Sequence, residues 1–93
     1  DAILCPTAPA PAFRIGEKID DPMQMYLTDV FTIPVNMAGL PGISIPGGLS
    51  SEGLPIGIQL IASHFKESKL IQLSSAFQNC AKRHLARPSL KVN

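Results

Sequence analysis

Asp29 is the residue whose type and surroundings point most clearly to binding chemistry. We predict it on a mostly apolar helix, and the mostly apolar segment 30–34 follows it at once. A buried carboxylate is costly unless it is paired with a positive group. The α-ammonium group of an amino-acid ligand is one physically sensible counter-ion. The alternatives are a carboxylate that faces the surface and one that forms a salt bridge with another segment. Composition leaves these alternatives open.

Ser50 and Ser51 follow Gly47 and Gly48, a combination that superficially resembles a Gly/Ser-rich catalytic loop. The segment lies between two apolar runs, however, and its glycines and serines are typical of a hairpin turn. We therefore expect a structural loop and assign neither serine a catalytic role.

The histidines and cysteines also fit structural roles. His64 precedes the predicted last helix and His84 follows it, and neither has an acidic residue or serine at triad-like spacing. We therefore expect exposed or capping histidines. Cys5 and Cys80 form neither a CxxC pair nor a Cys/His metal motif, and their apolar surroundings favour unreactive thiols that pack in the core. The sequence therefore predicts no catalytic residue and no metal site.

Two short helical segments are expected in the middle of the chain. Asp21 is suited to cap a helix that begins with Pro22, and apolar residues then recur at helical spacing as far as Val30. Pro34 should break or kink this helix, and a second short turn, capped at its start by a threonine, is expected over 32–39.

Strands are expected at 2–4, 42–46 and 55–62. The last two are apolar runs separated by a segment rich in turn residues, so we predict that they pair as neighbouring antiparallel strands of one sheet. Because the strand at 55–62 is apolar on one face and nearly so on the other, both faces are expected to be covered inside an α/β body.

The clearest amphipathic helix is expected near the C-terminal end. Its apolar stripe consists of Leu70, Leu73, Phe77 and either Cys80 or Ala81. Glu67 lies near the positive end of this predicted helix and Lys82 and Arg83 near its negative end, which favours the helix electrostatically.

The composition favours a segment of a larger body. Of the 93 residues 45% are apolar and only 16% charged, whereas about a quarter of a soluble domain is usually charged. The net charge of +1 offers no broad field for nucleic acid. The apolar runs are far shorter than the ~20 residues that cross a bilayer, so we expect no membrane association. The chain begins inside an expected strand, as a piece of a longer protein would.

Cysteine usage and the N-terminal sequence bear on the compartment. The two cysteines suggest no disulfide framework, and the N-terminal residues do not resemble a secretion signal. We therefore expect a reducing compartment, either the bacterial cytoplasm or an organelle.

Several blocks of the sequence together carry a family resemblance. These blocks are Glu17-Lys18-Ile19-Asp20-Asp21-Pro22, Met25-Tyr26 with Asp29, Asn36-Met37-Ala38-Gly39-Leu40-Pro41-Gly42 and Gly53-Leu54-Pro55-Ile56-Gly57-Ile58-Gln59. Over residues 1–82 the chain resembles the end of the glutamine-hydrolysing A subunits of the glutamyl-tRNA(Gln) and aspartyl-tRNA(Asn) amidotransferases. The last two blocks are typical of all amidase-signature enzymes, whereas the first two point to the amidotransferase branch.

The resemblance implies an α/β/α layered fold with a mixed central sheet, of which residues 1–93 would be the C-terminal segment of a single amidase domain. It also implies a Ser, cis-Ser, Lys triad that hydrolyses the glutamine side-chain amide through an acyl-enzyme. No residue of this chain matches the triad motifs, so the catalytic part would lie upstream of Asp1 and the isolated segment should be inactive.

One site residue and several partners follow from the same resemblance. Asp29 matches the family acid that holds the amino group of the substrate glutamine, which would serve orientation rather than bond breaking. The resemblance also implies a B subunit that uses ATP and Mg²⁺ to activate the glutamyl or aspartyl group on tRNA, and a small C subunit that braces the pair. tRNA would be contacted indirectly, through the B subunit, and this segment itself would hold no cofactor.

Two other functions remain open, and one departure from the family pattern stands out. The chain could belong to a stand-alone amidase that acts on another amide, or it could be a non-catalytic binding or structural piece. Asp29 discriminates between an amidotransferase A subunit and a stand-alone amidase, since a simple apolar amide has no ammonium group for the carboxylate to bind. The departure is Lys66, where the family often has an aspartate that caps the last helix.

Overall fold

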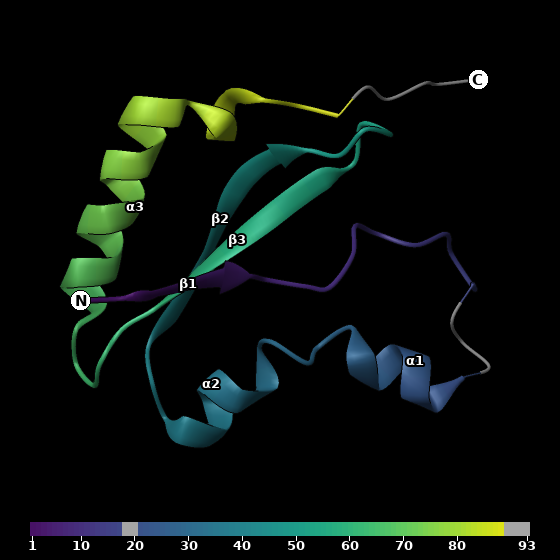
Figure 1. The fold of residues 1–93 in the computed structure, drawn as a ribbon, viewed down its shortest axis with the longest axis horizontal. Helices are drawn as coiled ribbons and strands as arrows, with labels where there is room; N and C mark the ends of the chain where they lie inside the picture. The colour runs from purple at the N-terminus through teal and green to yellow at the C-terminus, as the bar shows by residue number, and fades with distance from the viewer. Residues whose placement is uncertain (18–20, 89–93) are drawn as a thin grey trace.

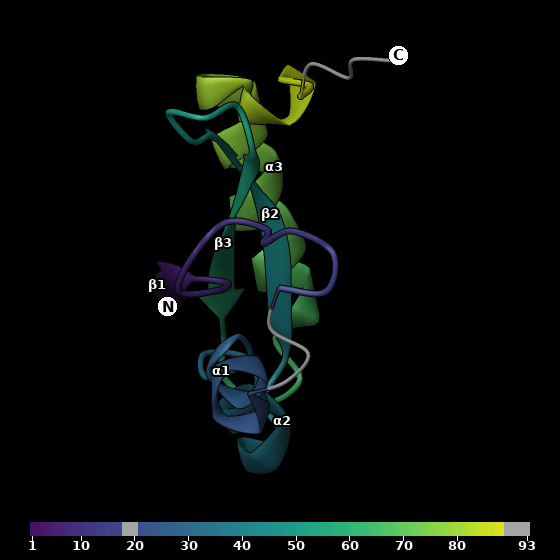
Figure 2. The same cartoon turned by 90° about the vertical axis from the view of Figure 1, so that its right-hand side faces the viewer.

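The structure is a computed structural model that describes residues 1–17 and 21–88. In this part of the chain a three-stranded antiparallel sheet has the order β1-β3-β2, with β1 at Ile3–Pro6, β2 at Gly42–Leu49 and β3 at Pro55–Ile61. The helix α3 (Glu67–Ala81) lies to one side of the strands, and α1 (Pro22–Leu27) and α2 (Ile33–Ala38) lie to the other (Figure 1). Figure 2 shows the same separation from a second direction.

The hairpin of β2 and β3 confirms the predicted antiparallel pair. Ser44 lies opposite Gln59 and Ile45 opposite Ile58, and the register shifts by a bulge between Pro46 and Gly48. The φ of Gly48 is 127°, a left-handed conformation that side chains disfavour, so the bulge requires glycine there.

The loop between these strands is shorter than predicted, because β2 continues to Leu49. Ser50 organises it: its backbone N–H donates to the Leu54 carbonyl at 2.7 Å, and its Oγ accepts from the backbone N–H groups of Glu52 and Leu54 at 3.2 and 3.1 Å. The hydroxyl of Ser50 is thus a turn acceptor, in agreement with the structural role that we predicted for this loop.

The two faces of the sheet differ in chemistry. Alternation along β2 and β3 places Ile43, Ile45, Ile58 and Leu60 on one face, and α3 contacts β2. Ile45 is 5% and Leu70 of α3 is 3% exposed, so one part of the small core lies between this face and α3; Val35 of α2 and Ala62 are the other buried apolar residues. The opposite face carries Cys5, Ser44 and Gln59 in one row across the three strands.

Coverage of the sheet is less complete than predicted. Ile3 and Leu4 on the edge strand are 62% and 65% exposed, and Ile56 of β3 is 39% exposed. Met37 of α2 is 83% exposed. The expectation that both faces of the strand at 55–62 are covered holds in part for the described residues: Ile56 is exposed, whereas Ile58, Leu60 and Ile61 are half-buried and Gln59 is buried.

The helix α1 begins as predicted but ends earlier. Asp21 has an extended backbone, and its carboxylate accepts from the N–H groups of Met23 and Gln24 at 3.1 and 3.3 Å. The helix ends at Leu27, and the Thr28 Oγ1 donates to the Met25 carbonyl at 2.6 Å. The predicted continuation to residue 30 is therefore wrong.

The helix α2 runs over Ile33–Ala38 and ends in the left-handed Gly39, as the predicted second turn requires. Thr32 precedes it but does not cap it with its side chain; the hydroxyl donates instead to the Asp29 carbonyl at 3.2 Å. His64 is exposed, and its Nδ1 lies 3.2 Å from the Gly39 carbonyl, which confirms the prediction of an exposed or capping histidine.

The helix α3 confirms most of the amphipathic stripe, with two exceptions. Leu70 and Ser74 are buried and Leu73 and Phe77 half-buried, but Cys80 and Ala81, the two alternatives for the last position of the stripe, are both exposed. Lys66 precedes the helix without a side-chain cap, as expected from its departure from the family.

His84 lies in the 3₁₀ turn η1 (Arg83–Leu85) and departs from the prediction of an exposed or capping residue. It is half-buried, and its Nδ1 is buried without a hydrogen-bond partner among the described residues. η1 contacts β2, and this packing accounts for the burial.

Candidate functional site

Asp29 lies in the turn that links α1 to α2, and not on a helix as predicted. Its side chain is exposed, and its carboxylate has no hydrogen-bond or ion-pair partner within residues 1–17 and 21–88. The physical reason for the correction is the early end of α1 at Leu27, after which Thr28 and the next residues form a turn. The carboxylate is therefore available to a cation from outside the described segment.

The backbone of this turn is held by several hydrogen bonds. The Asp29 carbonyl accepts from the N–H groups of Thr32 and Ile33, both at 3.1 Å, and from the Thr32 hydroxyl at 3.2 Å. The Asp29 N–H donates to the Tyr26 carbonyl at 3.1 Å. An exposed carboxylate on a fixed backbone suits the orientation of a ligand better than one on a loose loop.

Gln59 connects the turn to the sheet. This residue of the central strand is 5% exposed, and its Nε2 donates to the Phe31 carbonyl at 3.0 Å and to Cys5 Sγ at 3.4 Å. The contact with Cys5 agrees with the packing role predicted for that thiol. Sequence reasoning gave Gln59 no role, although two signals were present: it closes one of the family blocks, and it is the only polar side chain among the residues of β3.

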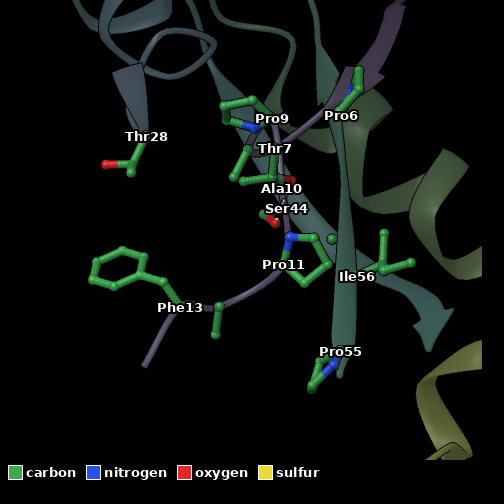
Figure 3. A pocket seen from close by; sticks show the side chains of 13 residues that line it. Pro6, Thr7, Pro9, Ala10, Pro11, Phe13, Thr28, Ser44, Pro55 and Ile56 are labelled. Carbon is green, nitrogen blue, oxygen red and sulfur yellow. Dashed lines mark hydrogen bonds between the residues drawn. The ribbon is translucent and has the colours of Figure 1, made fainter. Parts of the chain in front are cut away.

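An open cavity of about 600 Å³ lies beside this turn. Its walls come from the proline-rich segment 6–13, from Thr28 next to Asp29, from Ser44, and from residues 55–57. In Figure 3, Thr28 and Phe13 lie on one side of the cavity and Pro55 and Ile56 on the other. The lining is therefore mostly apolar.

A hydroxyl pair forms part of the polar lining of this cavity. Thr7 Oγ1 and Ser44 Oγ are 2.8 Å apart. A Cβ atom on Gly57 would lie 3.0 and 3.1 Å from these two oxygens, so glycine leaves the space that the pair occupies. The pair has no histidine or lysine partner within the described residues, so it lacks the base that an activated nucleophile requires.

The described part of the chain offers no other constellation for chemistry. No group of three or more His, Cys, Asp or Glu side chains in it is arranged to hold a metal ion. None of the helices in residues 1–17 and 21–88 has the length and apolar character needed to cross a membrane.

Comparison with known sequences decides the family. The profile described as Amidase matches residues 1–71, which is most of the chain. The chain belongs to the amidase family. The predicted resemblance to this family is confirmed.

The amidase-family relatives also point to one branch. The chain is 58% identical over 90 residues to the A subunit of glutamyl-tRNA(Gln) amidotransferase from Syntrophus aciditrophicus, and 60% identical over 81 residues to its counterpart of the same name from Parvibaculum lavamentivorans. These alignments cover 97% and 87% of this chain but 19% and 16% of the relatives. The chain thus spans about a fifth of the length of these relatives.

Solved amidase-family structures confirm the fold class. The crystal structure of the A subunit of glutamyl-tRNA(Gln) amidotransferase from Thermotoga maritima matches with a TM-score of 0.79 at 51% identity, over 85% of this chain and 17% of that one. The structure of 6-aminohexanoate cyclic dimer hydrolase matches with a TM-score of 0.80 at 32% identity, over 96% and 21%. The α/β prediction for the C-terminal part of an amidase-signature fold is therefore confirmed.

Proposed function

We propose that this chain is the C-terminal segment of the single amidase domain of a glutamine-hydrolysing amidotransferase A subunit. The high identity to proteins of that name across 97% of the chain supports the branch. The Ser, cis-Ser, Lys triad is assigned to residues upstream of Asp1. Ammonia released from glutamine would convert Glu-tRNA(Gln) to Gln-tRNA(Gln), or Asp-tRNA(Asn) to Asn-tRNA(Asn).

Asp29 is the residue of this segment that we assign to the substrate. Its carboxylate is exposed and unpaired among the described residues, and its carbonyl is held by three hydrogen bonds. This combination of a free charge and a fixed backbone supports binding of the glutamine α-ammonium group. A held ammonium group would orient the side-chain amide toward the nucleophile, and this geometry lowers the entropic part of the barrier.

The proposed complex places the remaining chemistry outside the segment. The B subunit would use ATP and Mg²⁺ to activate the amino acid on tRNA, and the C subunit would brace the A and B subunits. The absence of a cofactor from this segment, indirect contact with tRNA and a cytoplasmic or organellar location stay predictions.

The decisive experiment measures ammonia release from glutamine by the full-length A subunit with its partners. We expect Asp29→Ala to lower kcat/KM at least about tenfold, equivalent to ~1.4 kcal/mol of transition-state binding. Glutaramate, the glutamine analogue without the α-amino group, should be hydrolysed equally by the wild type and the variant. Glu52→Ala removes another exposed carboxylate, on the hairpin loop, and should leave the kinetics unchanged. Unchanged glutamine kinetics in Asp29→Ala would remove Asp29 from the substrate site.

A stand-alone amidase is the second candidate. The match to 6-aminohexanoate cyclic dimer hydrolase over 96% of the chain supports it, because the same fold segment occurs in an enzyme of that name. Hydrolysis of an amide without an ammonium group, at a rate that exceeds glutamine hydrolysis and does not depend on Asp29, would favour this candidate.

A further inference from the structure

Gln59 is the one polar side chain of β3 and is buried. It is 5% exposed in the central strand of the sheet, and Gln59 and Ser74 are the buried polar residues of the described segments. Removing an amide from water is unfavourable unless the amide forms hydrogen bonds inside the protein. The position of Gln59 therefore has to be explained by the groups to which it donates.

The amide of Gln59 joins segments far apart in the sequence. Its Nε2 donates to the Phe31 carbonyl at 3.0 Å, across 28 residues, and to Cys5 Sγ at 3.4 Å, across 54 residues. The carbonyl is the stronger acceptor of the two. The main bond of Gln59 is thus directed at the turn between α1 and α2.

Phe31 shares this turn with Asp29. The Asp29 carbonyl accepts from Thr32 and Ile33, the two residues that follow Phe31, so a shift of the Phe31 peptide would be passed directly to Asp29. The internal bonds define the shape of the turn. The bond from Gln59 fixes its place relative to the sheet.

The surroundings of Gln59 are closely packed. A Cβ atom on Gly42 would lie 3.6 Å from Gln59 Oε1 and 3.2 Å from Val35 Cγ1. Val35, on α2, is 8% exposed. The start of α2 therefore packs closely over the strand next to Gln59, so the turn and the amide meet at a tightly packed point.

We infer that Gln59 is a positioning residue for glutamine binding, because its buried amide holds the Phe31 carbonyl and thereby the turn that carries Asp29. This inference rests on the proposed role of Asp29. It goes beyond that role in assigning substrate affinity to a residue that does not touch the substrate. A glutamate in its place would present only acceptors to the Phe31 carbonyl when ionised, so the amide chemistry itself is required.

The test uses the full-length subunit with its partners and the variant Gln59→Met, which preserves chain length and removes the donors. We expect KM for glutamine to rise about tenfold with a smaller change in kcat, as misplacement of a binding group does. The same substitution in an Asp29→Ala background should add no further loss, and hydrolysis of glutaramate should be unaffected. Gln72→Met, at an exposed glutamine of α3, is the matched control.

The outcomes separate the inference from the proposed function. If Gln59→Met weakens glutamine hydrolysis equally in the wild-type and the Asp29→Ala backgrounds, or weakens glutaramate hydrolysis as much as glutamine hydrolysis, Gln59 is a stability residue only. Either result would overturn the inference. Unchanged kinetics in Asp29→Ala alone would instead overturn the proposed role of Asp29. If Gln59→Met does not fold, Gln59→Asn replaces it, because the shorter side chain cannot reach the Phe31 carbonyl as well. The rise in KM that Gln59→Asn causes should likewise disappear in the Asp29→Ala background.

Discussion

The two faces of the sheet are held by different physics. On the face toward α3, Ile43, Ile45 and Leu70 exclude water by apolar packing. The stability gained from such packing grows with the apolar area buried, and the packing tolerates side chains of similar size. On the opposite face, Gln59 and the pair Thr7 and Ser44 form directional contacts that depend on particular donors. The packed face should therefore control stability, and the polar face should control where the Asp29 turn lies.

The strongest way to test the packed face is Leu70→Ala. Leu70 is 3% exposed, and truncation of a buried leucine costs about 2–5 kcal/mol in unfolding free energy because a cavity remains. Urea or thermal unfolding of the full-length protein measures the effect. The KM for glutamine should stay near the wild-type value in the folded variant.

The control for this variant is Gln72→Ala on the exposed side of α3, expected within about 0.5 kcal/mol of wild type. A rise in KM from Leu70→Ala as large as that from Gln59→Met would show that the two faces are not separable in function.

The polar face is tested by Gly57→Ala. The new Cβ would lie 3.0 Å from Thr7 Oγ1 and 3.1 Å from Ser44 Oγ, so the hydroxyl pair has to move. We expect a loss of about 1–3 kcal/mol, as for other overpacked sites. Unfolding measurements on the single variant and on the same change in a Thr7→Ala, Ser44→Ala background form a double-mutant cycle.

In that background both clashing oxygens are gone, so the added methyl group should cost clearly less. An equal cost in both backgrounds would show that the strain arises from the strand backbone and not from the hydroxyl pair.

The packed face could be predicted from the sequence to a large extent. The apolar runs indicated β2 and β3, and the spacing of Leu70, Leu73 and Phe77 indicated α3, because hydrophobic periodicity is a local signal. The error at Cys80 arose because the sequence does not show which part of the helix β2 reaches.

The candidate site could be predicted only in part. Asp29 was singled out by its apolar surroundings and by a family resemblance, and its substrate role stays a prediction. Its place in a turn was not foreseen, because the Thr28 hydroxyl bonds back to the Met25 carbonyl where α1 ends. Gln59 was quoted in a family block but given no role, because its partner lies 28 residues away and long-range partners of a polar side chain have no local pattern.

The smallest expected effect lies at the start of α3. Lys66 precedes this helix without a side-chain cap, and its positive charge is close to the positive end of the helix dipole. Lys66→Asp would supply an acceptor for the free N–H groups of the first turn, so we expect a gain of about 0.5–1 kcal/mol in unfolding free energy. Lys66→Ala removes the charge without adding an acceptor and should recover only part of this gain. If the aspartate variant is no more stable than the alanine variant, the backbone at residue 66, whose φ and ψ are −105° and 36°, does not permit capping. The packing of Leu70 would then set the start of α3 without help from a side-chain cap.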